Sequence, residues 1–581
     1  MTLDAGMPVQ RGDELDRTHS ATEPDFIGIE ITRGRLQSIV DEAGAALIRT
    51  AFSHIVREAK DFACVITTPD GSTIVQSAQS VPVFLGTMTH AVRSLIGCFP
   101  VDALKPGDVI GTNDPWLSTG HLFDLTLVAP VFVGTEVVAF AAITAHLPDV
   151  GGRGFTVDSP TVFEEGVRLP PLYFTRSGET EQAIRQILAA NVRLPEQVLG
   201  DVDAMLNGLT VIGRRLRALC GEMGVTGFRQ AYSELEKRTE QAFRRAIHSV
   251  PDGIYEASVV TDGVVGKGFA IRLSLTVDGE EIRLDFTGSS PQVAAAVNSP
   301  LAYTRAYVVF ALKCLLAPRL PFNEGILRAI RVDAPEGTVV SSRFPAACAA
   351  RNLTGHFIPN LVIDALREVL PDRSIAECGS PRPIISLSGT NPRDGRMYYA
   401  PVLVMGGFGA RAKRDGPSAL VFPTNTETVP VEMVESTSPL LFDEKELVTD
   451  TGGPGRSRGG LGQRVTLRST AGDLLVSFVA QHLDRGPKGV LGGLPGGGTR
   501  VFVDGKRLDS IPGPLTIAAG KPVTLESPGG GGFGPPAERD RNDVERDLRL
   551  GYISAECADR VYGVRHAHNE PARTTPECPR A

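Results

Sequence analysis

The stretch GHLFDLTLVAPVFVGTEVVAFAAITAH at residues 120–146 contains two long apolar runs separated by a Gly-Thr-Glu turn at 134–136. Apolar runs of this length on either side of a short turn predict a β-hairpin. If the two strands pair about Thr135, Asp124 lies directly opposite His146, with their Cβ atoms roughly 5 Å apart. A register slip of one residue would place the two side chains on opposite faces, so the pairing decides whether they meet.

A second histidine lies just ahead of the first expected strand. His121 precedes Asp124 by three residues, so ideal strand pleating would point it to the other face. We therefore expect it on a bent loop, which Gly120 permits. Two imidazoles and a carboxylate at one end of a hairpin suit a divalent transition metal, manganese or zinc, with open coordination positions. The residues alone leave another interpretation open, in which the histidines are simply hydrogen-bonded and the aspartate binds backbone amides.

Composition limits the classes of protein to which the chain can belong. At 581 residues it is too long for one core, and its 42% hydrophobic and 22% charged residues are typical of globular proteins. A net charge of −8 provides no cationic field for nucleic acid or anionic lipid. No apolar run reaches the roughly 18 residues that a membrane span needs. The polar N-terminus is no secretory signal and the eight cysteines include no CxxC pair, so we expect a cytoplasmic protein with reduced thiols.

The periodicity of the chain predicts an α+β fold with several lobes, mixed sheets with helices, and a glycine-rich, β-dominated C-terminal region. Helices are expected at 28–59, 86–96, 180–247, 300–316, 355–370 and 540–549, and alternating strands at 61–75 and 253–290. The expected divisions are a disordered arm (1–26), an α/β lobe with the hairpin and a helical segment (27–250), an α+β middle lobe (251–420), a glycine-rich β lobe (421–564) and a flexible tail (565–581).

Other polar residues near the hairpin are further candidates. Asp149 lies three residues after His146 and Asp114 lies in an Asn-Asp-Pro sequence before the hairpin, so either carboxylate is a candidate catalytic base or outer partner of a histidine. Both are equally compatible with turn formation. The Glu164-Glu165 pair is a weaker candidate, because adjacent acidic residues usually form a solvated surface. Cys348, in FPAACAARN, is the cysteine to test as a nucleophile, although its small apolar neighbours favour burial.

The segment DTGGPGRSRGG at 450–460 combines glycines with two arginines. Successive glycine amides form anion-binding concavities in many proteins, and Arg456 and Arg458 would add donors for a substrate or another anion. The alternative is a tight structural crossover between sheet edges, which we favour slightly. The chain contains no GxxxxGK[ST] sequence, so this segment is not a nucleotide triphosphate loop.

Together these segments resemble the hydantoinase B family, the B-type subunits of ATP-dependent N-methylhydantoinase and 5-oxoprolinase and the related acetone and acetophenone carboxylase subunits. The resemblance covers residues 27–564. It rests on NDPWLSTGHLFDLTLVAPVF (113–132), AHLPDVGG (145–152), EEGVRLPP (164–171), LDFTGSSPQ (284–292), PFNEGILR (321–328), DTGGPGRSRGGLG (450–462) and PGGGGFGPPAERD (528–540).

The resemblance implies that His121, Asp124 and His146 hold a metal, as the matching positions do in the carboxylase relatives. It also implies a hetero-oligomer, in which an A-type subunit binds ATP and phosphorylates a cyclic amide substrate. The chain departs from the commoner family pattern at Phe84, where many members have histidine, and at Ser118-Thr119, where many have two glycines. The first departure puts in doubt any substrate contact made from that position.

From these features we predict the B-type subunit of an ATP-dependent cyclic-amide hydrolase of hydantoin, N-methylhydantoin or 5-oxoproline type. Two alternatives stay open on the sequence. One is a subunit of an ATP-dependent ketone carboxylase of acetone or acetophenone type, and the other is a non-catalytic scaffold for the ATP-binding partner.

Overall fold

The computed structural model describes residues 26–263, 268–420 and 422–565. Helices and several separate β-sheets alternate along the chain, as the predicted α+β class requires. Apart from Phe26 and Arg565, the arm expected at 1–26 and the tail expected at 565–581 lie outside the described residues. Within those residues, no helix is both long and apolar enough to span a bilayer.

The predicted hairpin forms the centre of a seven-stranded antiparallel sheet with the order β2-β1-β5-β4-β3-β6-β7. Its two strands are buried along most of their length because helices cover the sheet, which explains why both read as nearly continuous apolar runs. The strands of this sheet are β1 (Phe62–Thr67), β2 (Thr73–Gln76), β3 (Val109–Thr112), β4 (Asp124–Val133), β5 (Glu136–His146), β6 (Leu172–Arg176) and β7 (Glu179–Thr180).

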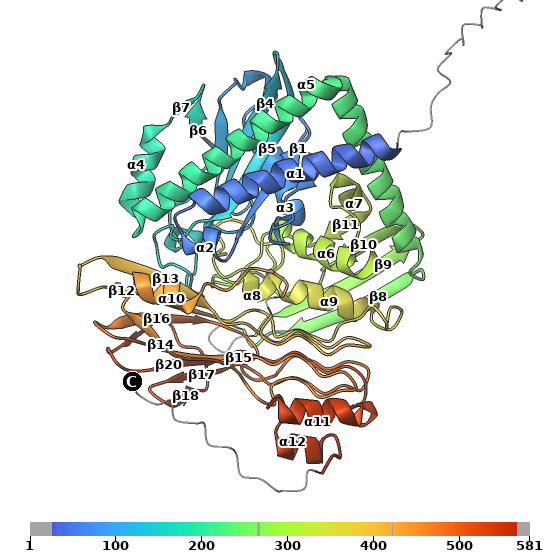
Figure 1. Ribbon diagram of the computed structural model, residues 1–581, viewed down its shortest axis with the longest axis vertical. Helices are drawn as coiled ribbons and strands as arrows, with labels where there is room; N and C mark the ends of the chain where they lie inside the picture. Colours follow the sequence, from blue (N-terminus) through green and yellow to red (C-terminus); the bar gives the residue numbers. More distant parts are fainter. Residues whose placement is uncertain (1–25, 264–267, 421, 566–581) are drawn as a thin grey trace, which may run out of the picture.

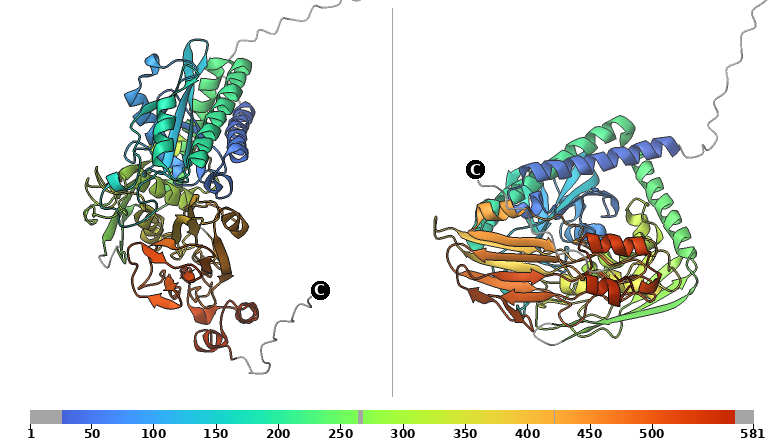
Figure 2. Two further views of the ribbon diagram at one scale, coloured as in Figure 1. Left: turned by 90° about the vertical axis from the view of Figure 1, so that its left-hand side faces the viewer. Right: turned by 60° about the horizontal axis from the view of Figure 1, so that its bottom comes forward.

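Two long helices, α1 (Phe26–Thr50) and α5 (Pro195–His248), lie side by side across one face of this sheet (Figures 1 and 2). Between them in the sequence lie the shorter helices α2 (His54–Arg57), α3 (Phe84–Cys98) and α4 (Gln182–Asn191). The helix α3 packs against both the sheet and α6 (Leu301–Leu316).

Two expected helices are each divided in the structure. The helix predicted at 28–59 stops at Thr50, because the backbone amides of Phe52 and Ser53 donate to the carboxylate of Asp201 at 2.7 and 3.0 Å, and Ser53 then caps α2. The segment predicted as helical over 180–247 breaks before Pro195, which starts α5. Helix α5 also bends at Gly224, whose φ of 76° no helical residue adopts.

The middle of the chain adds a four-stranded sheet with the order β11-β10-β9-β8. Its elements are β8 (Gly253–Val260), β9 (Ala270–Asp278), β10 (Glu281–Asp285), α7 (Glu324–Arg328), β11 (Ile330–Asp333), α8 (Asn352–Gly355) and α9 (Phe357–Leu366). Helix α9 packs on β8 and β9. The largest hydrophobic cluster includes buried side chains on both sides of the division expected at 250, such as Leu209 and Leu275. The lobe boundaries themselves stay a prediction.

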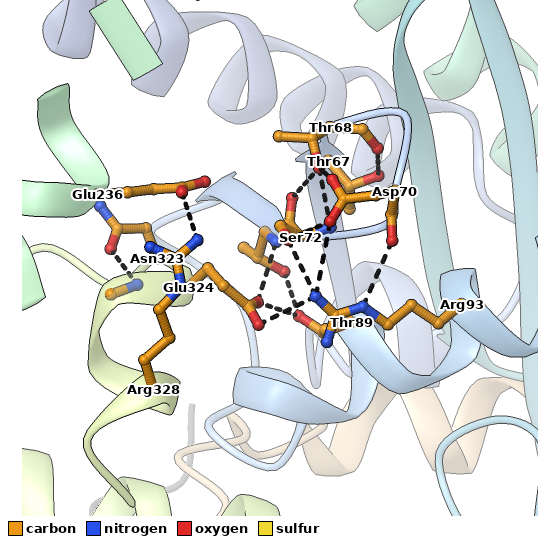
Figure 3. Close-up of polar contacts among 12 residues, drawn as sticks. Thr67, Thr68, Asp70, Ser72, Thr89, Arg93, Glu236, Asn323, Glu324 and Arg328 are labelled. Atoms are coloured by element: carbon orange, nitrogen blue, oxygen red, sulfur yellow. Dashed lines mark hydrogen bonds and ion pairs between the residues drawn. The ribbon is translucent and has the colours of Figure 1, made fainter. Parts of the chain in front are cut away.

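A polar network around two buried carboxylates, Glu324 and Glu236, fastens α7 to the first sheet (Figure 3). Glu324 pairs with Arg93 at 3.1 Å and accepts from Thr89 at 3.3 Å, so it joins α7 to α3. On the other side, Arg328 pairs with Glu236 of α5 at 2.9 Å. A Cβ atom at Gly325 would lie 2.3 Å from the Glu236 carbonyl oxygen. The PFNEGILR motif is therefore the point at which the middle of the chain docks on α5.

The last third of the chain forms two further sheets, β13-β12-β16-β19 and β14-β15-β20-β17-β18, which share a separate apolar core (Figure 1). The strands are β12 (Ile384–Thr390), β13 (Met397–Leu403), β14 (Leu440–Leu447), β15 (Gln463–Ser469), β16 (Leu474–Val479), β17 (Arg500–Val503), β18 (Lys506–Leu508), β19 (Leu515–Ile517) and β20 (Val523–Glu526). The accompanying helices are α10 (Val431–Thr437), α11 (Arg541–Arg549) and α12 (Ala555–Arg560), of which the sequence predicted only α11.

The glycines beside these sheets form a layer in which backbone packs directly on backbone. The Gly460 amide donates to the Phe408 carbonyl at 2.8 Å, and the Gly530 amide to the Gly460 carbonyl at 2.9 Å. A Cβ atom at Gly407 would lie 1.9 Å from the Gly460 oxygen, and one at Gly530 would lie 2.1 Å from the Phe408 oxygen. Only glycine allows so close an approach, which explains the glycine-rich motifs of this region.

This packing yields a stability prediction. We expect Gly407→Ala to lower the free energy of unfolding by about 3 kcal/mol or more, because the rigid Gly460 backbone cannot move aside. Gly34→Ala is the matched control, since Gly34 lies in α1 with no atom within 4 Å of the added methyl group. It should be neutral or stabilising by up to about 1 kcal/mol. Thermal unfolding of the two variants checks this, and equal melting temperatures would contradict it.

Candidate metal centre

The hairpin register pairs Asp124 with His146, as the sequence predicted. The turn is shorter than expected, because Val133 pairs with Glu136 across a two-residue loop of Gly134 and Thr135. A β-bulge then leaves Val138 of β5 unpaired, and this extra residue restores the predicted register for the rest of the hairpin.

His121 lies on a bent loop ahead of β4 and points toward the same place. Its Nε2 atom is 2.8 Å from Oδ1 of Asp124, and Nδ1 of His146 is 3.2 Å from the same oxygen. One donor atom from each of the three side chains lies within 4.8 Å of the other two. The three residues that the sequence singled out therefore form one cluster.

The protonation states of the cluster suit a cation. The Nδ1 atom of His121 lies 3.3 Å from the Ala349 carbonyl oxygen, which only accepts, so this nitrogen carries the proton and Nε2 keeps its lone pair. Burial and the nearby Arg351 lower the pKa of His121 to about 3, so the ring is neutral at physiological pH. Although burial opposes ionisation, the Arg351 guanidinium helps to hold the pKa of Asp124 well below its usual range.

The other oxygen of Asp124 is fixed by two donors. Thr119 Oγ1 and an Arg351 guanidinium nitrogen each donate to Oδ2 at 2.7 Å. This leaves Oδ1 facing the two imidazoles. Gly120 makes the arrangement possible, because its φ of 113° bends the loop and a Cβ atom there would lie 2.9 Å from Nε of Arg351.

Aromatic rings enclose the two histidines. Phe123 stacks on His146 with ring centroids 5.2 Å apart and planes 4° apart. Phe155 lies 6.3 Å from His121 and 6.4 Å from His146, and its amide donates to the Tyr399 hydroxyl at 2.8 Å. The His146 side chain is 13% exposed, against 5% for His121 and 1% for Asp124, so solvent reaches the cluster from the His146 side.

These residues fit a divalent transition metal on their own chemistry. Nε2 of His121 is buried and makes no well-aligned hydrogen bond to any residue that the structure describes, which is the condition of a nitrogen lone pair available to a metal. Two imidazole nitrogens and one carboxylate oxygen are a donor set found in zinc and manganese sites.

Known proteins are similar to this chain along nearly its whole length. Residues 25–536 match the Hydantoinase B/oxoprolinase family. The chain belongs to this family. It is 31% identical to an uncharacterised protein of Methanocaldococcus jannaschii over 93% of this chain and 96% of that protein. It is 29% identical to the caprolactamase subunit beta of Pseudomonas jessenii over 93% and 96% of the two chains.

Two solved structures share the fold of this hydantoinase B family member. The ATP-dependent caprolactamase from Pseudomonas jessenii matches with a TM-score of 0.85 and 27% identity, over 95% of this chain and 98% of that chain. A nucleotide-free acetone carboxylase matches with a TM-score of 0.84 over 93% of this chain and 80% of that chain. At 18% identity, the second likeness concerns the fold alone.

Within this family fold, the two expected catalytic aspartates lie outside the cluster. Asp149 is fully buried and is held by Arg193, which donates to it at 3.1 Å through Nε, and by the Gly151 amide at 3.0 Å. Asp114 accepts from the Trp116 amide at 2.9 Å, as in an Asx turn, and pairs with Arg168 at 3.2 Å. These contacts favour structural roles for both carboxylates. The catalytic roles of Asp149 and Asp114 stay predictions, and the contacts give them no support.

The two candidate anion-binding arginines are likewise occupied. Arg456 pairs with Glu538 at 2.8 Å, and the buried Arg458 pairs with Asp547 at 2.9 Å. Among the amides around them, that of Gly453 donates to the Gly530 carbonyl at 2.8 Å. These contacts favour the structural crossover that the sequence allowed as the alternative, and an anion-binding role for the two arginines remains a prediction.

Glu165 and Cys348 meet beside the cluster although they lie far apart in the sequence. One Glu165 oxygen accepts from the amides of Cys348 and Ala349 at 2.6 Å each, and thereby holds the carbonyl that fixes His121. Burial and the Glu165 carboxylate raise the pKa of the Cys348 thiol well above its usual value, which argues against a nucleophilic cysteine. The Glu165 side chain is fully buried, so a solvated acidic surface is wrong for this residue.

Sequence reasoning missed Arg351, Thr119 and Phe155. Arg351 lies 227 residues after the carboxylate it holds, and no local pattern marks it. It lies in the AACAARN segment, in which Cys348 was the only residue that the sequence marked as a candidate. Phe155 and Thr119 are single residues in loops, where periodicity gives no signal.

Glu165 provides a test of the site by pH. Burial raises its pKa to about 8, so the folded protein binds this proton more tightly than the unfolded chain does. The stability of the wild type should therefore fall as pH rises from about 4.5 to about 8, relative to Glu165→Gln, by an amount on the order of a few kcal/mol.

Denaturant unfolding across this pH range measures the difference between the two proteins. Glu164→Gln is the control, because Glu164 is half-exposed and forms a surface ion pair with Arg153 at 2.7 Å. Parallel stability profiles for the wild type and Glu165→Gln would show that Glu165 is ionised throughout.

Proposed function

We propose that this chain is the B-type subunit of an ATP-dependent cyclic-amide hydrolase, of hydantoin, N-methylhydantoin or 5-oxoproline type. It would act with a separate ATP-binding A-type subunit on a phosphorylated intermediate. The observation that carries the proposal is the convergence of His121, Asp124 and His146 in a chain of the Hydantoinase B/oxoprolinase family. The name of the caprolactamase subunit beta, whose substrate class is a lactam, supports both the reaction and the need for a partner.

The division of labour follows from the chemistry of the substrate. Resonance between nitrogen and carbonyl makes an amide carbon a poor electrophile, and phosphorylation of the amide oxygen would remove this resonance. The chain contains no GxxxxGK[ST] nucleotide loop, in keeping with ATP being bound by the partner. This subunit would then receive the activated intermediate and complete the hydrolysis.

The residues of the cluster would bind and orient the reacting groups. Thr119 and Arg351 fix the Asp124 carboxylate, and the Ala349 carbonyl fixes the His121 ring, so both side chains are preorganised. A zinc or manganese ion held by His121, Asp124 and His146 would polarise a substrate oxygen or lower the pKa of a water molecule. The aromatic rings of Phe123 and Phe155 would limit the access of other water.

The metal assignment predicts the behaviour of histidine variants. His121→Ala and His146→Ala should each reduce the metal content from about one ion per chain to near zero, because two remaining donors bind a divalent metal weakly. Both should abolish ATP-dependent lactam hydrolysis in the complex while leaving the circular dichroism spectrum unchanged. Elemental analysis and product assays measure these effects, and His248→Ala, at the exposed end of α5, is the control.

The same complex separates the competing reactions. Incorporation of labelled bicarbonate into a ketone, without lactam hydrolysis, would identify a carboxylase. Full turnover of a metal-free His121→Ala complex would eliminate the catalytic cluster. A partner subunit that is fully active alone would leave this chain as a scaffold.

A further inference from the structure

A second group of polar side chains beside the candidate metal centre has donors without partners among the described residues. His356 is fully buried, and neither of its ring nitrogens makes a hydrogen bond. The Nε atoms of two buried arginines, Arg351 and Arg382, are likewise unbonded. Buried polar groups normally have partners, because an unsatisfied donor in a protein interior is costly. Three such groups together indicate a polar ligand.

Two tyrosines connect Arg351 with His356. The Arg351 guanidinium lies 4.0 Å above the centre of the Tyr303 ring. The Tyr303 and Tyr307 hydroxyl oxygens are 3.3 Å apart, and the His356 ring meets Tyr307 edge-on with centroids 5.5 Å apart. Since Arg351 also donates to Oδ2 of Asp124, this group starts at the candidate metal centre. Arg382 lies close enough for its charge to act on His356, Tyr303 and Tyr307. For the ligand proposed below, we name Arg351, Arg382, His356, Tyr303 and Tyr307 the oxyanion pocket.

The charge of the oxyanion pocket favours an anion. Arg351 is neutralised by Asp124, but Arg382 donates only to the hydroxyls of Thr424 and Thr426 and has no ion pair among the described residues. The charge of Asp61 also acts on Arg382, but no ion pair joins the two side chains among the described residues.

His356 adds a neutral donor and acceptor to this positive charge. Burial, together with the charges of Arg382 and Arg351, lowers its pKa well below the usual value. A neutral imidazole offers one N–H donor and one acceptor nitrogen. The arginine and tyrosine donors are of the kind that recognises phosphate and carboxylate oxygens.

We propose that the oxyanion pocket binds the anionic group of the substrate, through Nε of Arg351, Nε of Arg382 and the His356 ring. In the proposed function, on which this assignment rests, the anionic group is the phosphoryl group of the activated amide or a carboxylate of the substrate. Both are small oxyanions, and both would lie beside a carbonyl carbon presented to His121, Asp124 and His146. Arg382 and His356 would then bind the substrate. In the described structure, neither of them contacts His121, Asp124 or His146.

The assignment is tested by titrating inorganic phosphate and acetate into the purified full chain by calorimetry. The wild type should bind at least one of the two anions, and the tighter of the two identifies the source as phosphoryl or carboxylate. Arg382→Gln and His356→Gln should each weaken that binding by about tenfold or more, because each removes a buried partner of a charged ligand. Their metal content should remain that of the wild type.

Further variants exclude simpler explanations. Arg382→Lys, which keeps the charge but loses Nε, should weaken binding less than Arg382→Gln. Tyr307→Phe removes only a hydroxyl group, and it tests the pocket if the other variants do not fold. The metal-free His121→Ala chain should still bind the anion, whereas an anion held by the metal alone would be lost. His248→Gln is the control for His356→Gln.

Two results would overturn the assignment: equal anion affinity in the wild type, Arg382→Gln, His356→Gln and Tyr307→Phe, or no binding of either anion to the wild type. Its failure is distinguishable from failure of the proposed function. If the wild-type complex hydrolyses a lactam but the pocket variants bind anions as the wild type does, only the assignment of the pocket fails. If anion binding depends on Arg382 but the complex does not hydrolyse a lactam, only the cyclic-amide assignment fails.

Discussion

The pairing of Asp124 with His146 across β4 and β5 is the constraint on which the site depends. A shift of one residue would turn one of the two side chains to the other face of the sheet. The register is fixed because β5 pairs also with β1 and β4 also with β3, so neither strand can slide alone. The bulge at Val138 is part of this register, since it compensates for the short turn at the far end of the hairpin.

The candidate metal centre also depends on a segment far away in the chain. The residues at 348–356 lie against the end of the hairpin and supply the Ala349 carbonyl for His121, the Arg351 guanidinium for Asp124 and the His356 ring. Close contact between these parts requires small residues at the junction. A Cβ atom at Gly355 would lie 2.2 Å from the Tyr303 ring, and one at Gly120 would meet Arg351. The cluster and the oxyanion pocket are therefore formed by the same junction.

The glycine layer of the last third connects to this junction. The Gly379 backbone lies so close to Pro528 that a Cβ atom would be 2.4 Å from the carbonyl oxygen, and His482 bonds to the Ser380 carbonyl at 2.8 Å. These contacts fix the segment that ends in Arg382. The glycine-rich region thus positions a side chain of the proposed substrate pocket.

The sequence by itself determined the hairpin, its register, the two histidines and the aspartate, because period and turn length act over a few residues. It also predicted α6 nearly to the residue, and the β-rich, glycine-rich last third. The end of α1 beside Asp201, the bend at Gly224, the burial of Glu165 and the pairing of Asp149 with Arg193 were not predictable in this way. Each of these depends on contacts between residues distant in the chain or on the φ of a single residue.

The same reason explains why the sequence did not predict the oxyanion pocket. Arg351, Arg382 and His356 carry no local motif, and their unbonded atoms become informative only once burial separates them from water. Local sequence determined which side chains could bind a metal. Only the tertiary structure decided which distant residues hold them and which remain free for a ligand, because burial and pairing are properties of the packed chain.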